Sequence, residues 1–174
     1  LDSGKSRVAE KIDGEWKTHQ HLKKAIMLSF RIYPMENLNG PYSSWYDKAH
    51  LLKGKTAGWG HSEFNKAGFR MLPNSPVRFG SFINKNAVLM PCFINVGAYI
   101  DSNTMMDTFS RAGSCCQIGK NCHISAGSGI ASVSAGVGSV QAAISDAVAA
   151  SDFQVFTREG RHIAGTALTA DTIT

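Results

Sequence analysis

The strongest pattern in the chain is a period of six residues that begins near residue 77. Every sixth residue is apolar in the series Phe82, Val88, Ile94, Ile100, Met106, Ala112, Ile118, Ile124 and Ile130. The positions two before these are small or fairly small: Gly80, Asn86, Cys92, Ala98, Thr104, Ser110, Cys116, Cys122 and Ser128. Two aligned registers with one period are typical of a hexapeptide solenoid. An antiparallel sandwich also fits the alternation in parts of 92–130, but it does not predict the aligned small residues.

The geometry of a solenoid explains both registers. Each coil is a triangle of three short strands, so one hexapeptide supplies one side and one corner. Because strand side chains alternate, residues two apart both point inwards. The residue after each aliphatic then lies at a corner, where small or polar types are favoured: Asn95, Asp101, Asp107, Gly113, Gly119 and Ser125. We therefore predict a mainly β fold with a parallel β-helix over 77–130.

The N-terminal pattern is different and predicts a small α/β segment. Segments 7–12 and 15–18 flank Asp13-Gly14, a dipeptide that tolerates the positive φ of a hairpin turn. We expect Thr18 to cap a helix that runs to about Arg31. Apolar residues repeat on one face of this helix: Leu22, Ile26 and Phe30.

Residues 33–76 hold four of the five prolines, which interrupt any long helix or strand. We expect one short helix from Glu63 to Gly68, and otherwise a loop and docking surface rich in Trp and Tyr. The sequence thus divides into an N-terminal hairpin and helix domain (1–76), the β-helix (77–130) and an atypical C-terminal segment (131–174).

The C-terminal segment breaks the register. The tract 126–138 is rich in Gly, Ser and Ala, as in a linker. Residues 141–150 favour a short helix, and 153–157 and 162–165 favour two strands. We expect residues before 77 to cover one end of the solenoid and this tail to cover the other.

Composition narrows the function classes. The chain is 43% hydrophobic and 18% charged with a formal net charge of +5, which suits a soluble globular protein. Its basic residues are scattered, so we expect a polyanionic small molecule and not nucleic acid. No stretch is long enough for a membrane span. The chain begins at Leu1 and not Met, so we expect a piece of a longer protein.

The cysteines show no zinc-ligand spacing, and we expect no metal. Cys92, Cys116 and Cys122 fall in the small inward register, where a free thiol packs as a small hydrophobe. A reduced, cytoplasmic protein follows from this interpretation.

Several segments, in order and with fitting spacing, resemble the tetrahydrodipicolinate N-succinyltransferase family. They are residues 1–4, 7–14, 22–25, 68–70, 88–91, 95–99, 113–115 and 117–121. The resemblance runs from residue 1 to about 130, and family members have further helical sequence before the position of Leu1. The tail does not match and faintly resembles a flagellin or hook-associated segment at 156–161.

The resemblance implies a fold, a reaction and an assembly. The family transfers a succinyl group from succinyl-CoA to the amine of a cyclic dicarboxylate in lysine biosynthesis. Its members are homotrimers of left-handed β-helices with active sites in clefts between subunits. We therefore expect a left-handed β-helix, a dicarboxylate acceptor and succinyl-CoA as a co-substrate, with no tightly bound cofactor.

The resemblance also assigns two residues. Arg70, in Gly-Phe-Arg, would bind a substrate carboxylate, for which the arginine fork is suited. Asp107, in Met-Asp-Thr, would face the reacting end of the substrate and accept the proton of the amine. The alternatives are a surface ion pair for Arg70, and for Asp107 a corner cap like Asp101.

Three departures keep other functions open. Phe109 stands where the family usually has Trp, and the Gly-rich run is altered at 125–129. The later coils of the family are absent from this sequence. So is their Ser-Glu-Val-Val-Glu-Gly segment, which in the family supplies another carboxylate and much of the CoA site. His123 points outwards, as a solvated residue or as the base of another hexapeptide acyltransferase. A non-catalytic oligomeric structural protein is the third hypothesis.

Overall fold

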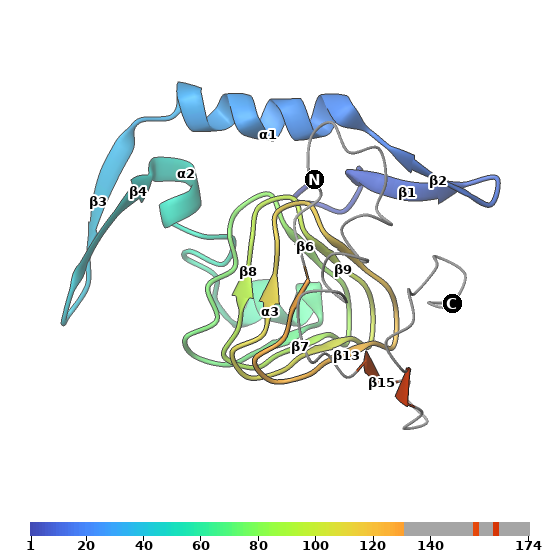
Figure 1. Ribbon diagram of the computed structural model, residues 1–174. Coiled ribbons are helices and arrows are strands. Elements are labelled where there is room, and N and C mark those ends of the chain that lie inside the picture. The colour runs from blue at the N-terminus through green and yellow to red at the C-terminus, as the bar shows by residue number, and fades with distance from the viewer. Residues whose placement is uncertain (131–154, 157–161, 164–174) are drawn as a thin grey trace.

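The structure is a computed structural model that describes residues 1–130, 155–156 and 162–163 (Figure 1). Its central part is a parallel β-solenoid of about three turns, so the predicted mainly β fold is confirmed. Very short strands form its walls: β5 (Arg70–Met71), β6 (Phe82–Ile83), β7 (Val88–Leu89), β8 (Phe93–Ile94), β9 (Tyr99–Ile100), β10 (Met105–Met106), β11 (Arg111–Ala112), β12 (Gln117–Ile118), β13 (His123–Ile124) and β14 (Gly129–Ile130). The parallel ladders run β5-β7-β10-β13, β8-β11-β14 and β6-β9-β12.

The interior of the solenoid follows the predicted period from Ile94 onwards. The inward aliphatic side chains are buried, among them Ile94, Ile100 and Met106, each 0% exposed. The small inward positions Ala98, Thr104, Ser110 and Cys116 are buried as well. Cys92 joins them, and Cys122 packs against the same core, so the predicted packing role of these three thiols is confirmed.

Before Ile94 the predicted register was wrong by one residue. Ile83 and Leu89 point inwards, not Phe82 and Val88. Ser81 and Ala87, both 0% exposed, fill the small positions that we assigned to Gly80 and Asn86. Each of these strands carries two adjacent apolar residues, so hydrophobicity alone could not choose between them.

The physical cause of the shift is one shortened corner. Leu89 pairs with Met106, which makes a coil of 17 residues, whereas Ile94 pairs with Ala112 in a coil of 18. The missing residue lies in the turn that contains Pro91. Other corners contain a residue with positive φ: Gly80, Asn86, Gly97, Asn103, Phe109, Cys115, Asn121 and Gly127. Within the described chain, residues 90–92 contain none.

Three of the predicted corner residues close their turns with side-chain hydrogen bonds. The Oδ1 atoms of Asn95, Asp101 and Asp107 accept the N–H of the following residue at 2.9, 2.7 and 2.7 Å. These bonds satisfy backbone donors that the strands leave free, as in an Asx turn. The prediction that these residues lie at corners is confirmed.

The N-terminal hairpin and helix also match the prediction, apart from the cap. Strands β1 (Ala9–Ile12) and β2 (Glu15–Thr18) pair antiparallel, and Asp13 and Gly14 have φ of 54° and 84°. Helix α1 (Gln20–Ile32) has His19 at its N-cap with no side-chain cap bond, so the Thr18 cap was wrong. The predicted apolar face packs in a second core, made of Val8, Ile26, Leu51, Val96 and Cys115 with Leu1, Leu22 and Phe30 beside it.

Residues 35–48 form a hairpin that we predicted as loop. Strands β3 (Met35–Asn39) and β4 (Ser44–Lys48) pair antiparallel and project away from the solenoid (Figure 1). All of β3 is exposed, so no alternation of buried and exposed residues marked it in the sequence. Helices α2 (Ala49–Leu52) and α3 (His61–Ala67) follow, and α3 confirms the predicted short helix near 63–68.

Two strands of the C-terminal segment are among the residues that the structure describes. β15 (Val155–Phe156) pairs antiparallel with β13 and with β16 (His162–Ile163), and both strands lie within the two predicted segments 153–157 and 162–165. The predicted helix at 141–150 lies outside the described residues, as does most of the predicted linker at 126–138. The described part of the chain contains no helix that is long and apolar enough to cross a membrane.

Candidate functional site

One outer wall of the solenoid gathers the residues that carry candidate chemistry. In the ladder β5-β7-β10-β13, Arg70 pairs with Val88, Val88 with Met105, and Met105 with His123. These side chains alternate with the buried positions, so all of them face outwards. Adjacent strands lie about 4.8 Å apart, which separates the backbones of Arg70 and His123 by about 14 Å.

Asp107 and His123 form a contact on this wall. His123 Nε2 lies 3.0 Å from Asp107 Oδ2, and the Asp107 side chain is 28% exposed. Asp107 Oδ1 accepts the backbone N–H of Thr108 at 2.7 Å. The Thr108 N–H and, next, the His123 hydrogen bond hold the pKa of Asp107 below its usual value. Because an ionised carboxylate only accepts, His123 donates from Nε2.

Asp107 and Asp101, its equivalent in the preceding hexapeptide, have different surroundings in the structure. Asp101 is 9% exposed, and its Oδ1 accepts from Asn84 Nδ2 at 2.8 Å as well as from Ser102. Asp101 is thus committed to its corner. Asp107 closes its corner with one oxygen and directs the other outwards to His123, which makes it the more available base.

Arg70 is held by an aromatic cluster and faces solvent. Phe69 is buried beside Trp59 and Phe64, with ring centroids 6.0 Å away in both cases. The exposed Arg70 side chain forms no hydrogen bond or ion pair with any residue in the part of the chain that the structure describes. The alternative of a surface ion pair therefore has no partner among these residues.

The predicted pair of site residues shares a wall but not a contact. Asp107 follows β10, while Arg70 lies in β5, with β7 between the two strands. Val88 and Met105 form an apolar floor in this interval. Two strand spacings amount to about 10 Å, which a long arginine side chain can partly span.

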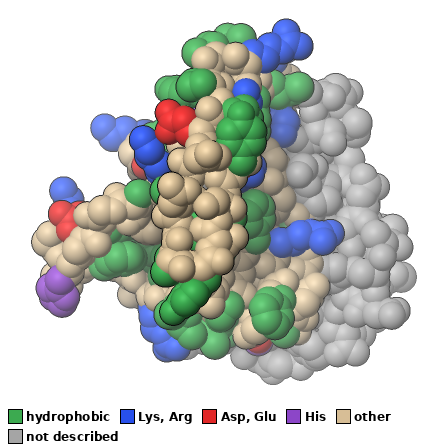
Figure 2. All heavy atoms as spheres, turned by 90° about the vertical axis from the view of Figure 1, so that its left-hand side faces the viewer, with side chains coloured by type: hydrophobic (Ala, Val, Ile, Leu, Met, Phe, Trp, Pro, Cys, Tyr) green, Lys and Arg blue, Asp and Glu red, His purple; other side chains and the backbone are tan. Residues whose placement is uncertain are grey.

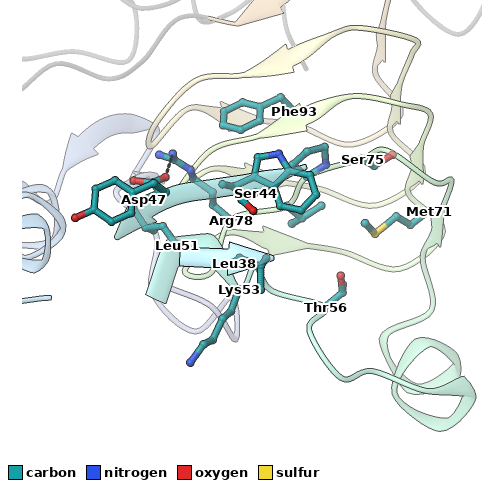
Figure 3. Close-up of a pocket in the computed structure, with 15 residues that line it drawn as sticks. Leu38, Ser44, Asp47, Leu51, Lys53, Thr56, Met71, Ser75, Arg78 and Phe93 are labelled. Carbon is teal, nitrogen blue, oxygen red and sulfur yellow. Dashed lines mark hydrogen bonds and ion pairs between the residues drawn. The ribbon is translucent and has the colours of Figure 1, made fainter. Parts of the chain in front are cut away.

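A larger cleft lies elsewhere, between the β3-β4 hairpin and the solenoid (Figure 3). It has a volume of about 720 Å³, and Trp45 and Phe93 are among its lining residues. Arg78 pairs there with Asp47 at 2.7 Å and lies 5.5 Å from the Phe93 ring centre. We expected a docking surface rich in Trp and Tyr in this region but not this cleft, because the hairpin that supplies Asp47 was not predicted.

The buried thiols are unsuited to nucleophilic work. Burial raises the pKa of Cys92 to about 12, and it raises the pKa of Cys116 and of Cys122 as well. A thiol reacts as its thiolate, so these groups are inert at neutral pH while the core is intact.

Comparisons with known proteins agree with the geometry. A family model described as "Tetrahydrodipicolinate N-succinyltransferase N-terminal" matches residues 1–32. The chain is 67% identical over 133 residues to the 2,3,4,5-tetrahydropyridine-2,6-dicarboxylate N-succinyltransferase of Pelagibacter ubique, covering 76% of this chain and 48% of that protein. It is 52% identical over 133 residues to the enzyme of the same name from Sodalis glossinidius, with 76% and 47% covered.

A third relative of that name, from Acinetobacter baylyi, is 50% identical over 133 residues, with 76% of this chain and 48% of the relative covered. The chain spans about half the length of the curated relatives that it matches. The matched part contains the hairpin, α1 and the described coils, and the tail contributes nothing to the likeness. Over residues 1 to about 133, the chain belongs to the tetrahydrodipicolinate N-succinyltransferase family.

Proposed function

We propose that this chain takes part in the transfer of a succinyl group from succinyl-CoA to the amine of tetrahydrodipicolinate, a step of lysine biosynthesis. The observation that carries the proposal is the outer wall of the solenoid. On this wall Arg70, which pairs with no residue that the structure describes, and the ionised Asp107 lie either side of an apolar floor. The names of relatives that are 50–67% identical support the same reaction.

Asp107 is the proposed base. Its carboxylate accepts a proton from the acceptor amine as the amine nitrogen bonds to the thioester carbon. The carbon–sulfur bond then breaks, and CoA leaves as a thiolate that takes up a proton. The lowered pKa of Asp107 keeps the group ionised at neutral pH, ready to accept.

Arg70 is the proposed anchor of the acceptor. A guanidinium pairs with a carboxylate through two parallel hydrogen bonds, which fix direction as well as position. A dicarboxylate that is anchored in this way holds its amine in one position. This positioning supplies much of the acceleration in a two-substrate reaction.

The proposed partners follow from the same reaction. Succinyl-CoA is a co-substrate, the net charge of +5 suits its phosphates, and no tightly bound cofactor is needed. We propose a cytoplasmic homotrimer. The apolar side chains exposed along α1 and the projecting hairpin, such as Ile32 and Trp45, support contacts between copies.

The test is thiol release from succinyl-CoA by the full chain in the presence of tetrahydrodipicolinate. We expect Asp107→Asn to lower kcat by about a hundredfold. Arg70→Ala should raise the KM of the acceptor by about tenfold or more. Arg31→Ala removes another exposed arginine, on α1, and serves as the control that leaves both constants unchanged.

A second candidate rests on the Asp107–His123 contact. A carboxylate that holds a histidine is also the arrangement in which the histidine is the base, for a hydroxyl or another amine acceptor. Turnover of acceptors that lack a carboxylate, with no loss in Arg70→Ala, would favour this function. A folded chain that neither binds CoA thioesters nor turns over any acceptor would favour a structural role.

A further inference from the structure

His50 lies at the root of the β3-β4 hairpin, where α2 meets the last turn of α1. Its Nε2 lies 3.2 Å from Ser29 Oγ, and its ring stacks on the Tyr33 ring with the two centroids 4.0 Å apart. The Phe30 ring meets it edge-on, with centroids 6.3 Å apart. One histidine thus packs at the junction from which the hairpin leaves the rest of the molecule (Figure 1).

The hydrogen bonds decide which nitrogen of His50 carries the proton. Ser29 Oγ donates its own proton to the carbonyl oxygen of Ile26 at 2.6 Å, so it accepts from His50 Nε2. Nδ1 then carries a lone pair, and this buried atom has no hydrogen-bond partner among the residues that the structure describes. A neutral ring is compatible with this site. A protonated ring places a charged N–H where no acceptor lies, and an unpaired charged donor is more costly to bury than a neutral group.

The charged groups around the ring do not supply the missing acceptor. On α1 the ring contacts uncharged side chains. Asp47 is the acidic residue whose charge acts on His50, but its Oδ1 accepts the N–H of Lys48 and its Oδ2 accepts from Arg78, both at 2.7 Å. Burial lowers the pKa of His50, the charge of Asp47 opposes this, and Arg78 and Lys48 lower the pKa further. Proton uptake therefore works against the position of His50 in the fold.

The hairpin depends on this junction for its placement. Two further hydrogen bonds at the root lie within two residues of His50: Ala49 N–H donates to Pro34 O, and Lys48 Nζ donates to Tyr33 O, both at 3.1 Å. Beyond the root the strands project from the molecule, and all of β3 is exposed. Because a two-stranded hairpin is marginally stable alone, a loosened root changes the freedom of the whole hairpin.

We propose that His50 is an acid-sensitive hinge: when it takes up a proton, α2 loosens from α1 and the β3-β4 hairpin is freed to move. The hairpin supplies Leu38 and Trp45 to the cleft of about 720 Å³, so the cleft loses a fixed wall in acid (Figure 3). The inference concerns the hairpin and not the outer wall with Asp107, so it is independent of the proposed reaction.

The direction of the pH effect follows from the lowered pKa. Because the folded protein holds the His50 proton more weakly than an unfolded chain does, the folded state binds fewer protons. The stabilisation by neutral His50 is fully present above the ordinary pKa of histidine. It is lost as the pH falls through the lowered pKa of the folded state.

The test is an NMR titration of the full chain from neutral to acid pH. The Trp45 indole N–H reports on the hairpin, and that of Trp59, which packs against the solenoid core, is the internal reference. We expect the Trp45 signal to shift together with the His50 ring, at a midpoint below the ordinary pKa of histidine, while the Trp59 signal stays in place. Amide exchange in 35–48, corrected for the direct effect of pH, should become about tenfold faster in acid.

His50→Gln is the matched variant, because its amide still donates to Ser29 Oγ but takes up no proton in this range. We expect its hairpin signals to keep their neutral-pH positions throughout the titration. His61→Gln removes an exposed histidine on α3, and its hairpin should titrate as in the wild type.

Loss of the hairpin transition in His50→Gln but not in His61→Gln supports the hinge. A transition that persists in His50→Gln overturns it, as does a wild-type His50 ring that titrates while the hairpin signals stay in place. A ring that stays neutral until the chain unfolds overturns it too. If the Trp45 and Trp59 signals change together, acid unfolds the molecule as a whole and the inference is wrong.

Discussion

At the scale of single residues, Asp101 and Asp107 show how one position of a repeat acquires different roles. Both cap their corners through Oδ1. Asp101 also accepts from Asn84 and is nearly buried, whereas Asp107 receives His123 from the next coil. The sequence placed both at corners and left the capping alternative open for each. Their difference depends on neighbours about one coil away.

His123 therefore has a measurable effect on Asp107. Its hydrogen bond lowers the pKa of Asp107, so His123→Gln should move that pKa back upwards, in part only, because the larger contribution comes from the Thr108 N–H. A carboxylate with a depressed pKa is ionised above that pKa and is lost as a base when the pH falls through it. The acid limb of kcat/KM should thus shift to higher pH in His123→Gln.

The measurement is a pH–rate profile, with a titration of the Asp107 carboxyl by NMR as an independent readout. His61→Gln changes an exposed histidine on α3 and is the control. An acid limb that stays in place in His123→Gln would show that the contact does not tune Asp107.

At the scale of elements, the projecting hairpin is the main feature that sequence patterns missed. Side chains of Trp45 and Tyr46 are 49% and 65% exposed, and Figure 2 shows hydrophobic side chains spread along the hairpin. A hairpin of two strands is marginally stable alone in water. The ion pair between Asp47 and Arg78 ties its base to the solenoid. Tertiary contacts therefore stabilise this hairpin, and no repeating pattern of apolar residues marks it in the sequence.

The register before Ile94 provides a stability test of the shortened corner. Leu89 is 0% exposed inside the prism, so Leu89→Ala should lower the free energy of unfolding by about 2–5 kcal/mol. Val88 faces outwards on the neighbouring position, and Val88→Ala should cost about 1 kcal/mol or less. Urea unfolding of the two variants measures the difference. The uninterrupted period of six predicts the opposite order, and observing that order would contradict the shift.

At the scale of the whole molecule, the solenoid has two ends that need covering. Helix α3 lies across the open end of the first coils (Figure 1), where Trp59, Phe64 and Ala67 pack against the interior. The prediction that residues before 77 cover one end is confirmed. At the other side, β15 pairs with β13 and extends its sheet.

Deletion of residues 141–174 removes β15 and leaves the outer edge of β13 unpaired. Unpaired edges associate with other chains, so we expect the shortened chain to aggregate. Size-exclusion chromatography with light scattering measures this. Deletion of 164–174 keeps β15 and β16 and is the control. A chain without 141–174 that stays soluble and uniform in size would contradict the covering role of the tail.

The sequence by itself determined the features that arise from local pattern. The turn at Asp13 and Gly14, the face of α1 and the coils after Ile94 were predicted because backbone preference and burial repeat at fixed short intervals. His123 was predicted to face outwards, and Asp107 to lie at a corner, for the same reason, but the contact between the two side chains was not predicted.

The tertiary structure alone decided which of Val88 or Leu89 enters the core, that 35–48 pair, and that the corner at Pro91 is shortened. The physical reason is that these features depend on residues a coil or more apart. In a solenoid, contacts across coils fix the register, and a single shortened corner moves every earlier side chain to the opposite face.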